Sequence, residues 1–184
     1  MTKLDICNMA LTRCGAELIA SLNDTSKRAK LVTNQYELTL KECLNDSPWN
    51  FAIKRATLEQ KDEVSLGLPY QYEIPTDCIR VLELPLGVTY KVESGYLYSD
   101  NGTTVDIRYL AYIEDATKYN PSFVKAFALK LAEDISYALV QSASLQQSII
   151  QEAERYIRRA RSYNSQEGTP EGRYPDEYTA GIRL

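Results

Sequence analysis

The first 46 residues carry two segments in which apolar side chains return every three or four positions. The apolar face of the first segment consists of Leu4, Cys7, Leu11 and Cys14. Thr2 is a suitable N-cap and Gly15 a suitable C-terminal cap, so we predict a helix over residues 3–14. The apolar face of the second segment consists of Val32, Tyr36, Leu40 and Cys43. We predict a longer helix over residues 24–46, which Pro48 ends because the residue before a proline is pushed out of helical geometry.

From residue 49 to residue 113 the pattern changes to the alternation of apolar and polar positions that is typical of strands. The two clearest strands, Tyr90–Tyr98 and Thr104–Tyr112, flank the pair Asn101-Gly102. An Asn-Gly pair between two alternating segments is a strong signal for a hairpin. We therefore predict that these residues form a small antiparallel sheet.

Helical spacing returns after Asn120, a suitable N-cap followed by Pro121 at the first helical position. Apolar side chains then follow with helical spacing at Phe123, Phe127, Leu131, Ile135 and Ala138, and again at Leu145, Ile149, Ala153, Tyr156, Ala160 and Tyr163. We predict helices over residues 121–142 and 144–163, packed as a helical hairpin. Residues 165–184 contain three glycines and two prolines without any period, which predicts an extended arm.

These elements predict an α+β protein with one domain over residues 1–164. Its two N-terminal and two C-terminal helices are expected to form a four-helix bundle, with the β-sheet inserted at about residues 49–113. The 184-residue chain is 44% hydrophobic, enough for a single core. It has no long apolar run and no charged-then-apolar opening of a signal peptide. We expect a soluble protein that does not bind membranes and is made in a cytoplasm.

The residues offer little catalytic chemistry. The chain has no histidine, which excludes serine-histidine and cysteine-histidine nucleophiles, and it has no phosphate-binding glycine loop. The carboxylate pairs Asp62-Glu63 and Glu114-Asp115 fall in predicted loops, where we expect them to be solvated. We expect no enzyme activity, no cofactor and no metal.

The four cysteines lack the short spacing of a metal site or a redox motif. They are Cys7, Cys14, Cys43 and Cys78. We interpret them as small buried apolar residues of a reducing compartment, with neither a disulfide bond nor a bound metal. Trp49 is the only tryptophan, and we expect it to be buried where the helices meet the sheet.

A basic cluster in the last predicted helix comprises Arg155, Arg158, Arg159 and Arg161. Such a cluster can track a nucleic-acid backbone, so one hypothesis is a small nucleic-acid-binding helical module. Near the end of a helix, however, cations also oppose the helix dipole and pair with acidic neighbours, and we favour this interpretation. A third interpretation is salt bridges to a neighbouring subunit. The net charge of −4 disfavours nucleic acid as the main partner.

Fourteen tyrosines are an unusual number for this length, and two of them lie in the predicted arm. An aromatic side chain gains little in a segment without a core unless another chain supplies a pocket. We therefore predict a partner-binding segment whose anchors are Tyr174, Pro175, Tyr178, Ile182, Arg183 and Leu184. The alternative is an arm that folds back on its own helices.

Several segments resemble the tail tubular protein A family, the head-to-tail adaptors of short-tailed bacteriophages. The most specific is Asp46–Ala52, with its Pro-Trp-Asn-Phe-Ala run at the predicted helix-to-sheet junction. The other similar segments are Asp5–Leu11, Tyr70–Pro75, Asp77–Glu83, Asp106–Tyr109, Pro121–Phe123 and Gln166–Pro170. The resemblance covers nearly the whole chain except the residues after Pro170.

The resemblance implies a structural protein of the virion that is assembled in the host cytoplasm. It implies a homo-oligomeric ring, commonly of twelve subunits, between the portal protein of the capsid and the tail nozzle, a tail tubular protein B-like partner. DNA would pass through the ring without specific binding. A mildly acidic chain suits such a channel wall, because DNA must slide along it rather than be held.

Overall fold

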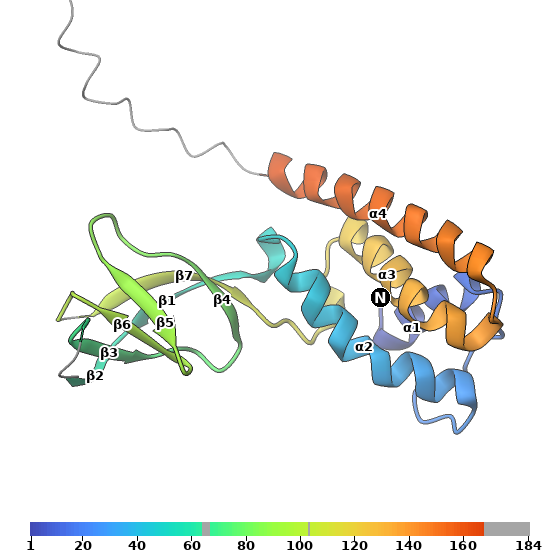
Figure 1. Ribbon diagram of the computed structural model, residues 1–184, viewed down its shortest axis with the longest axis horizontal. Coiled ribbons are helices and arrows are strands. Elements are labelled where there is room, and N and C mark those ends of the chain that lie inside the picture. Colours follow the sequence, from blue (N-terminus) through green and yellow to red (C-terminus); the bar gives the residue numbers. More distant parts are fainter. Residues whose placement is uncertain (64–66, 103, 168–184) are drawn as a thin grey trace, which may run out of the picture.

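The computed structural model describes residues 1–63, 67–102 and 104–167 and shows an elongated molecule with a helical part and a β part (Figure 1). The helices are α1 (Lys3–Arg13), α2 (Lys27–Asn45), α3 (Pro121–Val140) and α4 (Ala143–Gln166), with short 3-10 turns at Asn50–Ala52 and Ala116–Lys118. No helix in these ranges is long and apolar enough to cross a membrane.

Side-chain caps fix where the helices begin. Thr2 and Asp5 form a capping box, in which the Thr2 hydroxyl accepts from the Asp5 amide at 3.2 Å and the Asp5 carboxylate accepts from the Thr2 amide at 2.8 Å. α2 begins at Lys27 rather than at residue 24, because Ser26 is its N-cap. Asn120 caps α3, with its side chain accepting from the Ser122 amide at 3.0 Å.

The predicted four-helix bundle with one small sheet is wrong. α3 lies in the centre of the helical part, and α1, α2 and α4 each pack against it. This arrangement follows from the sequence of α3, whose buried residues point in all directions around the helix axis: Phe123, Val124, Ala126, Phe127, Ala128, Leu129, Leu131, Ala132 and Ile135. A helix that is apolar all round is surrounded by its neighbours. α4 buries only Ile149, Ala153 and Ala160, so it lies on the surface.

The strands form two antiparallel sheets instead of one. The first has the order β1-β7-β4, built from β1 (Ile53–Leu58), β7 (Val105–Ala111) and β4 (Cys78–Glu83). The second has the order β2-β3-β6-β5, built from β2 (Gln60–Glu63), β3 (Tyr70–Glu73), β6 (Tyr96–Ser99) and β5 (Tyr90–Glu93). β1 and β7 connect the helical part with the β part, while the second sheet lies at the far end of the molecule (Figure 1).

The hairpin turn lies at Ser94-Gly95 and not at Asn101-Gly102. Ser94 and Gly95 both have positive φ, 50° and 82°, which suits a two-residue turn and folds the predicted strand Tyr90–Tyr98 into the β5-β6 hairpin. Gly102 instead lies on the ring of Tyr70, where a Cβ atom would be only 2.6 Å from the ring. The Asn-Gly pair therefore belongs to the passage from one sheet to the other.

Candidate interaction surfaces

The junction between the helices and the first sheet is built around Trp49. Its side chain is 1% exposed, and the indole nitrogen donates to the Cys43 carbonyl at 2.8 Å. The ring packs edge-on against Phe123, with centroids 4.9 Å apart, and stacks near Phe51 at 6.4 Å. The prediction that Trp49 is buried at this junction is confirmed. The Pro-Trp-Asn-Phe-Ala run is thus an anchor that joins the two parts of the molecule.

Amide side chains fasten the end of α4 to the same junction. The Asn164 side chain accepts from the Asn50 amide at 2.8 Å and donates to the Pro48 carbonyl at 3.0 Å. The Asn50 side chain in turn donates to the Asn164 carbonyl at 2.7 Å and to the Glu167 carboxylate at 3.3 Å. That carboxylate also accepts from the Asn120 side chain at 2.6 Å. The chain is therefore held at the junction up to residue 167.

The arginine cluster on α4 is engaged mainly within its own chain. Arg158 pairs with Glu154 one turn earlier at 3.5 Å. Arg161 forms a salt bridge with Asp46 at the end of α2, and its Nε donates to the same carboxylate at 3.1 Å. Arg161 therefore connects α4 to α2.

The other two arginines of the cluster interact with tyrosines of α4. Arg155 lies over the Tyr156 ring at 5.6 Å from its centroid. Arg159 lies over the Tyr163 ring at 5.3 Å and donates to its hydroxyl at 2.8 and 3.0 Å. Both guanidinium groups lie at the surface, where they can still meet a neighbouring chain.

The predicted anchors of the arm lie outside the described residues. They are Tyr174, Pro175, Tyr178, Ile182, Arg183 and Leu184. The predicted start of the arm at residue 165 falls within α4, which continues to Gln166.

Apolar side chains are exposed at two opposite ends of the molecule. At the helical end, the last turn of α3 exposes Tyr137 (56%) and Val140, and Leu18 (59% exposed) belongs to the neighbouring loop between α1 and α2. We call these three residues the helical-end surface. At the β end, the edge strand β5 exposes Tyr90 and Val92, which we call the sheet-end surface. The two surfaces differ in secondary structure and lie far apart (Figure 1).

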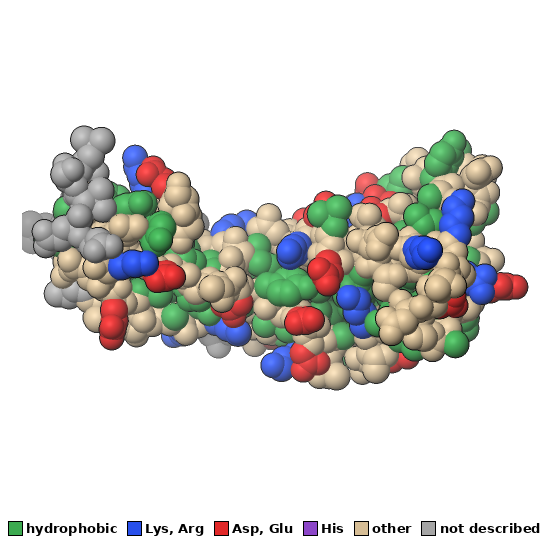
Figure 2. Space-filling view, turned by 90° about the horizontal axis from the view of Figure 1, so that it is seen from below, with side chains coloured by type: hydrophobic (Ala, Val, Ile, Leu, Met, Phe, Trp, Pro, Cys, Tyr) green, Lys and Arg blue, Asp and Glu red, His purple; other side chains and the backbone are tan. Residues whose placement is uncertain are grey.

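Charges of the two signs are interspersed on the face shown in Figure 2, and over the helical part neither sign forms a continuous patch. This face, which is seen from below in the view of Figure 1 and lies away from α4, has no basic stripe of the kind that most nucleic-acid-binding domains present to phosphates.

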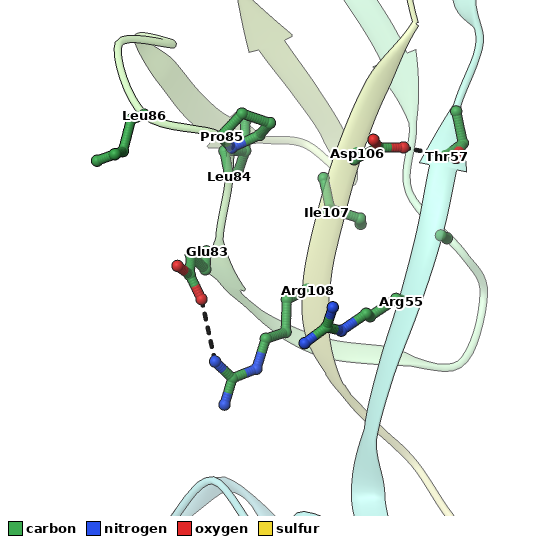
Figure 3. A pocket seen from close by; sticks show the side chains of 10 residues that line it. Arg55, Thr57, Glu83, Leu84, Pro85, Leu86, Asp106, Ile107 and Arg108 are labelled. Atoms are coloured by element: carbon green, nitrogen blue, oxygen red, sulfur yellow. Dashed lines mark hydrogen bonds and ion pairs between the residues drawn. The ribbon is translucent and has the colours of Figure 1, made fainter. Parts of the chain in front are cut away.

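A groove lies on the outer face of the first sheet, at the register row where Arg55 of β1, Arg108 of β7 and Glu83 of β4 meet (Figure 3). It has a volume of about 890 Å³ and continues along Leu84, Pro85 and Leu86. Sequence reasoning missed this groove, because its members come from three strands that are far apart in the sequence.

The carboxylate pairs that the sequence offered were checked against the described structure, together with possible metal ligands. No group of three or more Cys, Asp or Glu side chains among them could hold a metal ion. Asp115 caps the 3-10 turn at Ala116–Lys118, and its hydrogen bonds from Thr117 lower the pKa of its carboxyl. The Asp62-Glu63 pair belongs to β2 and not to a loop.

The four cysteines are free thiols in this structure. Burial raises the pKa of Cys7 and of Cys14 to about 11, and it raises the pKa of Cys43 and of Cys78 as well. Since the thiolate is the reactive form, these groups are poor nucleophiles at neutral pH.

No protein-family model matches this sequence, and no curated protein is similar to it.

Proposed function

We propose that this chain is a non-enzymatic structural subunit that assembles into a ring and acts as the head-to-tail adaptor of a short-tailed bacteriophage. The main observation in support of a ring is that the helical-end surface and the sheet-end surface, which differ in structure, lie at opposite ends of the molecule. Contacts between two different surfaces are head-to-tail contacts, which generate rings when the rotation between copies closes. Tyr137 is 56% exposed and Val92 49% exposed, and a contact between the two surfaces would cover both.

The adaptor role rests on the resemblance of the sequence to the tail tubular protein A family. The most specific of its segments, Asp46–Ala52, links α2 to the end of α4 through the hydrogen bonds of Trp49 and Asn50, and it leads directly into β1. A rigid joint of this kind suits a subunit that must transmit contacts from the portal on one side to the nozzle on the other. The interspersed charges on the face shown in Figure 2 suit a wall past which DNA slides.

Complementary variants test the head-to-tail contact. Tyr137→Asp removes the helical-end surface and Val92→Asp the sheet-end surface, so each should stop assembly when present in every copy. Mixed together, the two variants still possess one intact pair of surfaces and should form heterodimers that cannot grow. Leu38→Asp is the matched control, because Leu38 is 55% exposed on α2, away from both surfaces. Normal assembly of both single variants would contradict the proposed contact.

The alternative function, a nucleic-acid-binding helical module, predicts tight binding of duplex DNA by α4. The internal partners of Arg158 and Arg161 argue against it. A titration with duplex DNA at moderate salt separates the two functions. Saturable binding that is lost in an Arg155→Glu, Arg159→Glu double variant would favour the module over the adaptor.

The arm is proposed to dock on the portal or on an adjacent adaptor. The docking hypothesis requires that deleting residues 170–184 leaves the thermal unfolding midpoint unchanged and abolishes joining to the portal. A truncated protein that unfolds at a lower temperature and still binds the portal would show that the arm belongs to its own core.

A further inference from the structure

The strand β5 has an open edge. The second sheet has the order β2-β3-β6-β5, so within the described part of the chain β5 pairs only with β6. It lies far from the helices (Figure 1), and each of its four residues, Tyr90–Glu93, is exposed. The outer side of such a strand presents backbone N–H and C=O groups without partners, which form a template for a further strand.

The other edge strands of the two sheets are less suited to receive a strand. A bulge interrupts the pairing of β2 with β3, and the pairing of β4 with β7 is irregular at two places. Irregularities of this kind protect an edge from a further strand. β1 is regular, but its charged residues, Lys54 and Arg55, are both basic. β5 is in continuous register with β6 and carries one charge of each sign, Lys91 and Glu93.

The β5-β6 hairpin determines which backbone groups of β5 point outward. The two-residue turn at Ser94-Gly95 makes Glu93 and Tyr96 a hydrogen-bonded pair. Along an antiparallel ladder, hydrogen-bonded pairs alternate with pairs that are not hydrogen-bonded. The N–H and C=O groups of Val92 therefore face away from β6, and no backbone hydrogen bond outside the hairpin uses them in the described structure.

The sequence of β5 is complementary to itself. When two copies pair antiparallel about Val92, Lys91 of each copy lies opposite Glu93 of the other. The two Val92 residues then face each other and exchange both of their outward backbone hydrogen bonds. Shifting the register by two residues in either direction would oppose two Lys91 or two Glu93 side chains, and like charges directly opposite destabilise a sheet. We propose that a second copy of this chain binds the β5 edge in the register centred on Val92.

This pairing goes beyond the proposed ring and does not require it. A contact about a two-fold axis closes with two copies, whereas a head-to-tail contact continues into a ring. The pairing covers Val92, which belongs to the sheet-end surface, so a paired subunit cannot use that surface for ring growth. Because a strand of four residues forms few backbone hydrogen bonds, the pairing is reversible and can give way to the ring contact. Free subunits are thus held as dimers before they assemble.

A disulfide trap in the full-length chain tests the register. Val92→Cys places two thiols at a hydrogen-bonded pair, whose Cα atoms lie about 5.5 Å apart, within the range of a disulfide. Mild oxidation should therefore give a covalent dimer. Tyr90→Cys is the matched control, because two Tyr90 residues would lie about 13 Å apart along the paired strands, and it should give little product. The native thiols interfere little, since three of the four are buried and Cys78 is half-buried.

A charge swap tests the two ion pairs. Lys91→Glu opposes like charges at both pairs and should weaken dimerisation at least about tenfold, as measured by sedimentation at rising concentration. Adding Glu93→Lys to the same chain restores opposite charges in the same register and should restore the dimer. Lys30→Glu, at an exposed position on α2, makes the same change of charge elsewhere and should have no effect. A double variant that dimerises no better than Lys91→Glu would contradict the pairing.

The outcomes separate this inference from the proposed function. Rings formed by a chain whose Val92→Cys variant gives no more cross-link than Tyr90→Cys overturn the pairing and leave the adaptor proposal standing. Dimers that follow the charge swap, in a chain that never forms rings, support the pairing and contradict the ring. Loss of the dimer when residues 170–184 are deleted would overturn the pairing and assign the β5 edge to the arm.

Discussion

Replacing Trp49 by alanine should destabilise the protein strongly. The side chain is 1% exposed and packs against Phe123 of α3 and Phe51 of the 3-10 turn before β1, so its removal leaves a large cavity there. Truncating a buried tryptophan costs about 3 to 5 kcal/mol, a large part of the roughly 5 to 15 kcal/mol that holds a domain folded. The variant also leaves the Cys43 carbonyl without its indole donor.

Urea unfolding followed by circular dichroism measures this cost. Trp49→Phe retains much of the packing and loses the hydrogen bond, so it should cost less than the alanine variant, about 1 to 3 kcal/mol for the unpaired carbonyl. Leu38→Ala is the surface control, with 55% of its side chain exposed, and should shift the free energy of unfolding by under about 0.5 kcal/mol. A Trp49→Ala protein with an unchanged midpoint would refute the anchoring role of the junction.

Further expectations concern single side chains. A thiol reagent at pH 8 should modify half-buried Cys78 first and should modify Cys43 only when the protein unfolds, because burial raises the pKa of the Cys43 thiol and shields it from the reagent. Equal rates of modification at the two cysteines would contradict this expectation. The Lys54 ammonium donates to the Asp77 carboxylate at 2.6 Å and lowers the pKa of that carboxyl below its ordinary value of 3.8. The ion pair therefore stabilises the fold fully above pH 3.8, and this stabilisation is lost as the pH falls through the lower pKa of the folded state. Asp77→Asn should therefore cost at most about 1 kcal/mol at pH 7 and nothing under strongly acidic conditions, as urea unfolding across pH would reveal. Asn164→Ala should speed amide exchange in the last turn of α4 severalfold, and unchanged protection would count against its anchoring bonds.

Local signals predicted the helices well. The caps at Thr2 and Asn120 and the stop at Pro48 act within one or two turns, so the sequence alone contains them. The start of α2 was placed early because several cap-forming residues stand in a row. Ser26 caps the helix, while the Asp24 side chain accepts from the Ser26 amide at 2.9 Å in the preceding turn.

Long-range pairing explains what the sequence pattern could not predict. The predicted strand Tyr90–Tyr98 contains the pair Ser94-Gly95, a local turn signal that the prediction overlooked, and positive φ at both residues makes the turn of the β5-β6 hairpin. β7 pairs with β1 and β4 rather than with β6, its neighbour in sequence, which produces two sheets. We predicted a single apolar face for the helix α3, although its buried residues surround the helix axis.

The candidate surfaces depended on the same long-range pairing. Arg55 and Arg108 become neighbours only through the register of two distant strands. The salt bridge of Arg161 with Asp46 joins residues 115 positions apart, so no local pattern could assign its partner. For Asn50, the resemblance marked its segment as specific, but its bonds to the end of α4 emerged only in the structure.

The most direct test of the central claim is negative-stain imaging of the purified full-length chain, alone and mixed with the portal protein that we propose as its partner. We predict closed rings of uniform size, with about twelve subunits as the family resemblance implies, that stack on the portal. Particles that remain single copies of 20.9 kDa at every concentration, with and without the portal, would contradict the adaptor function.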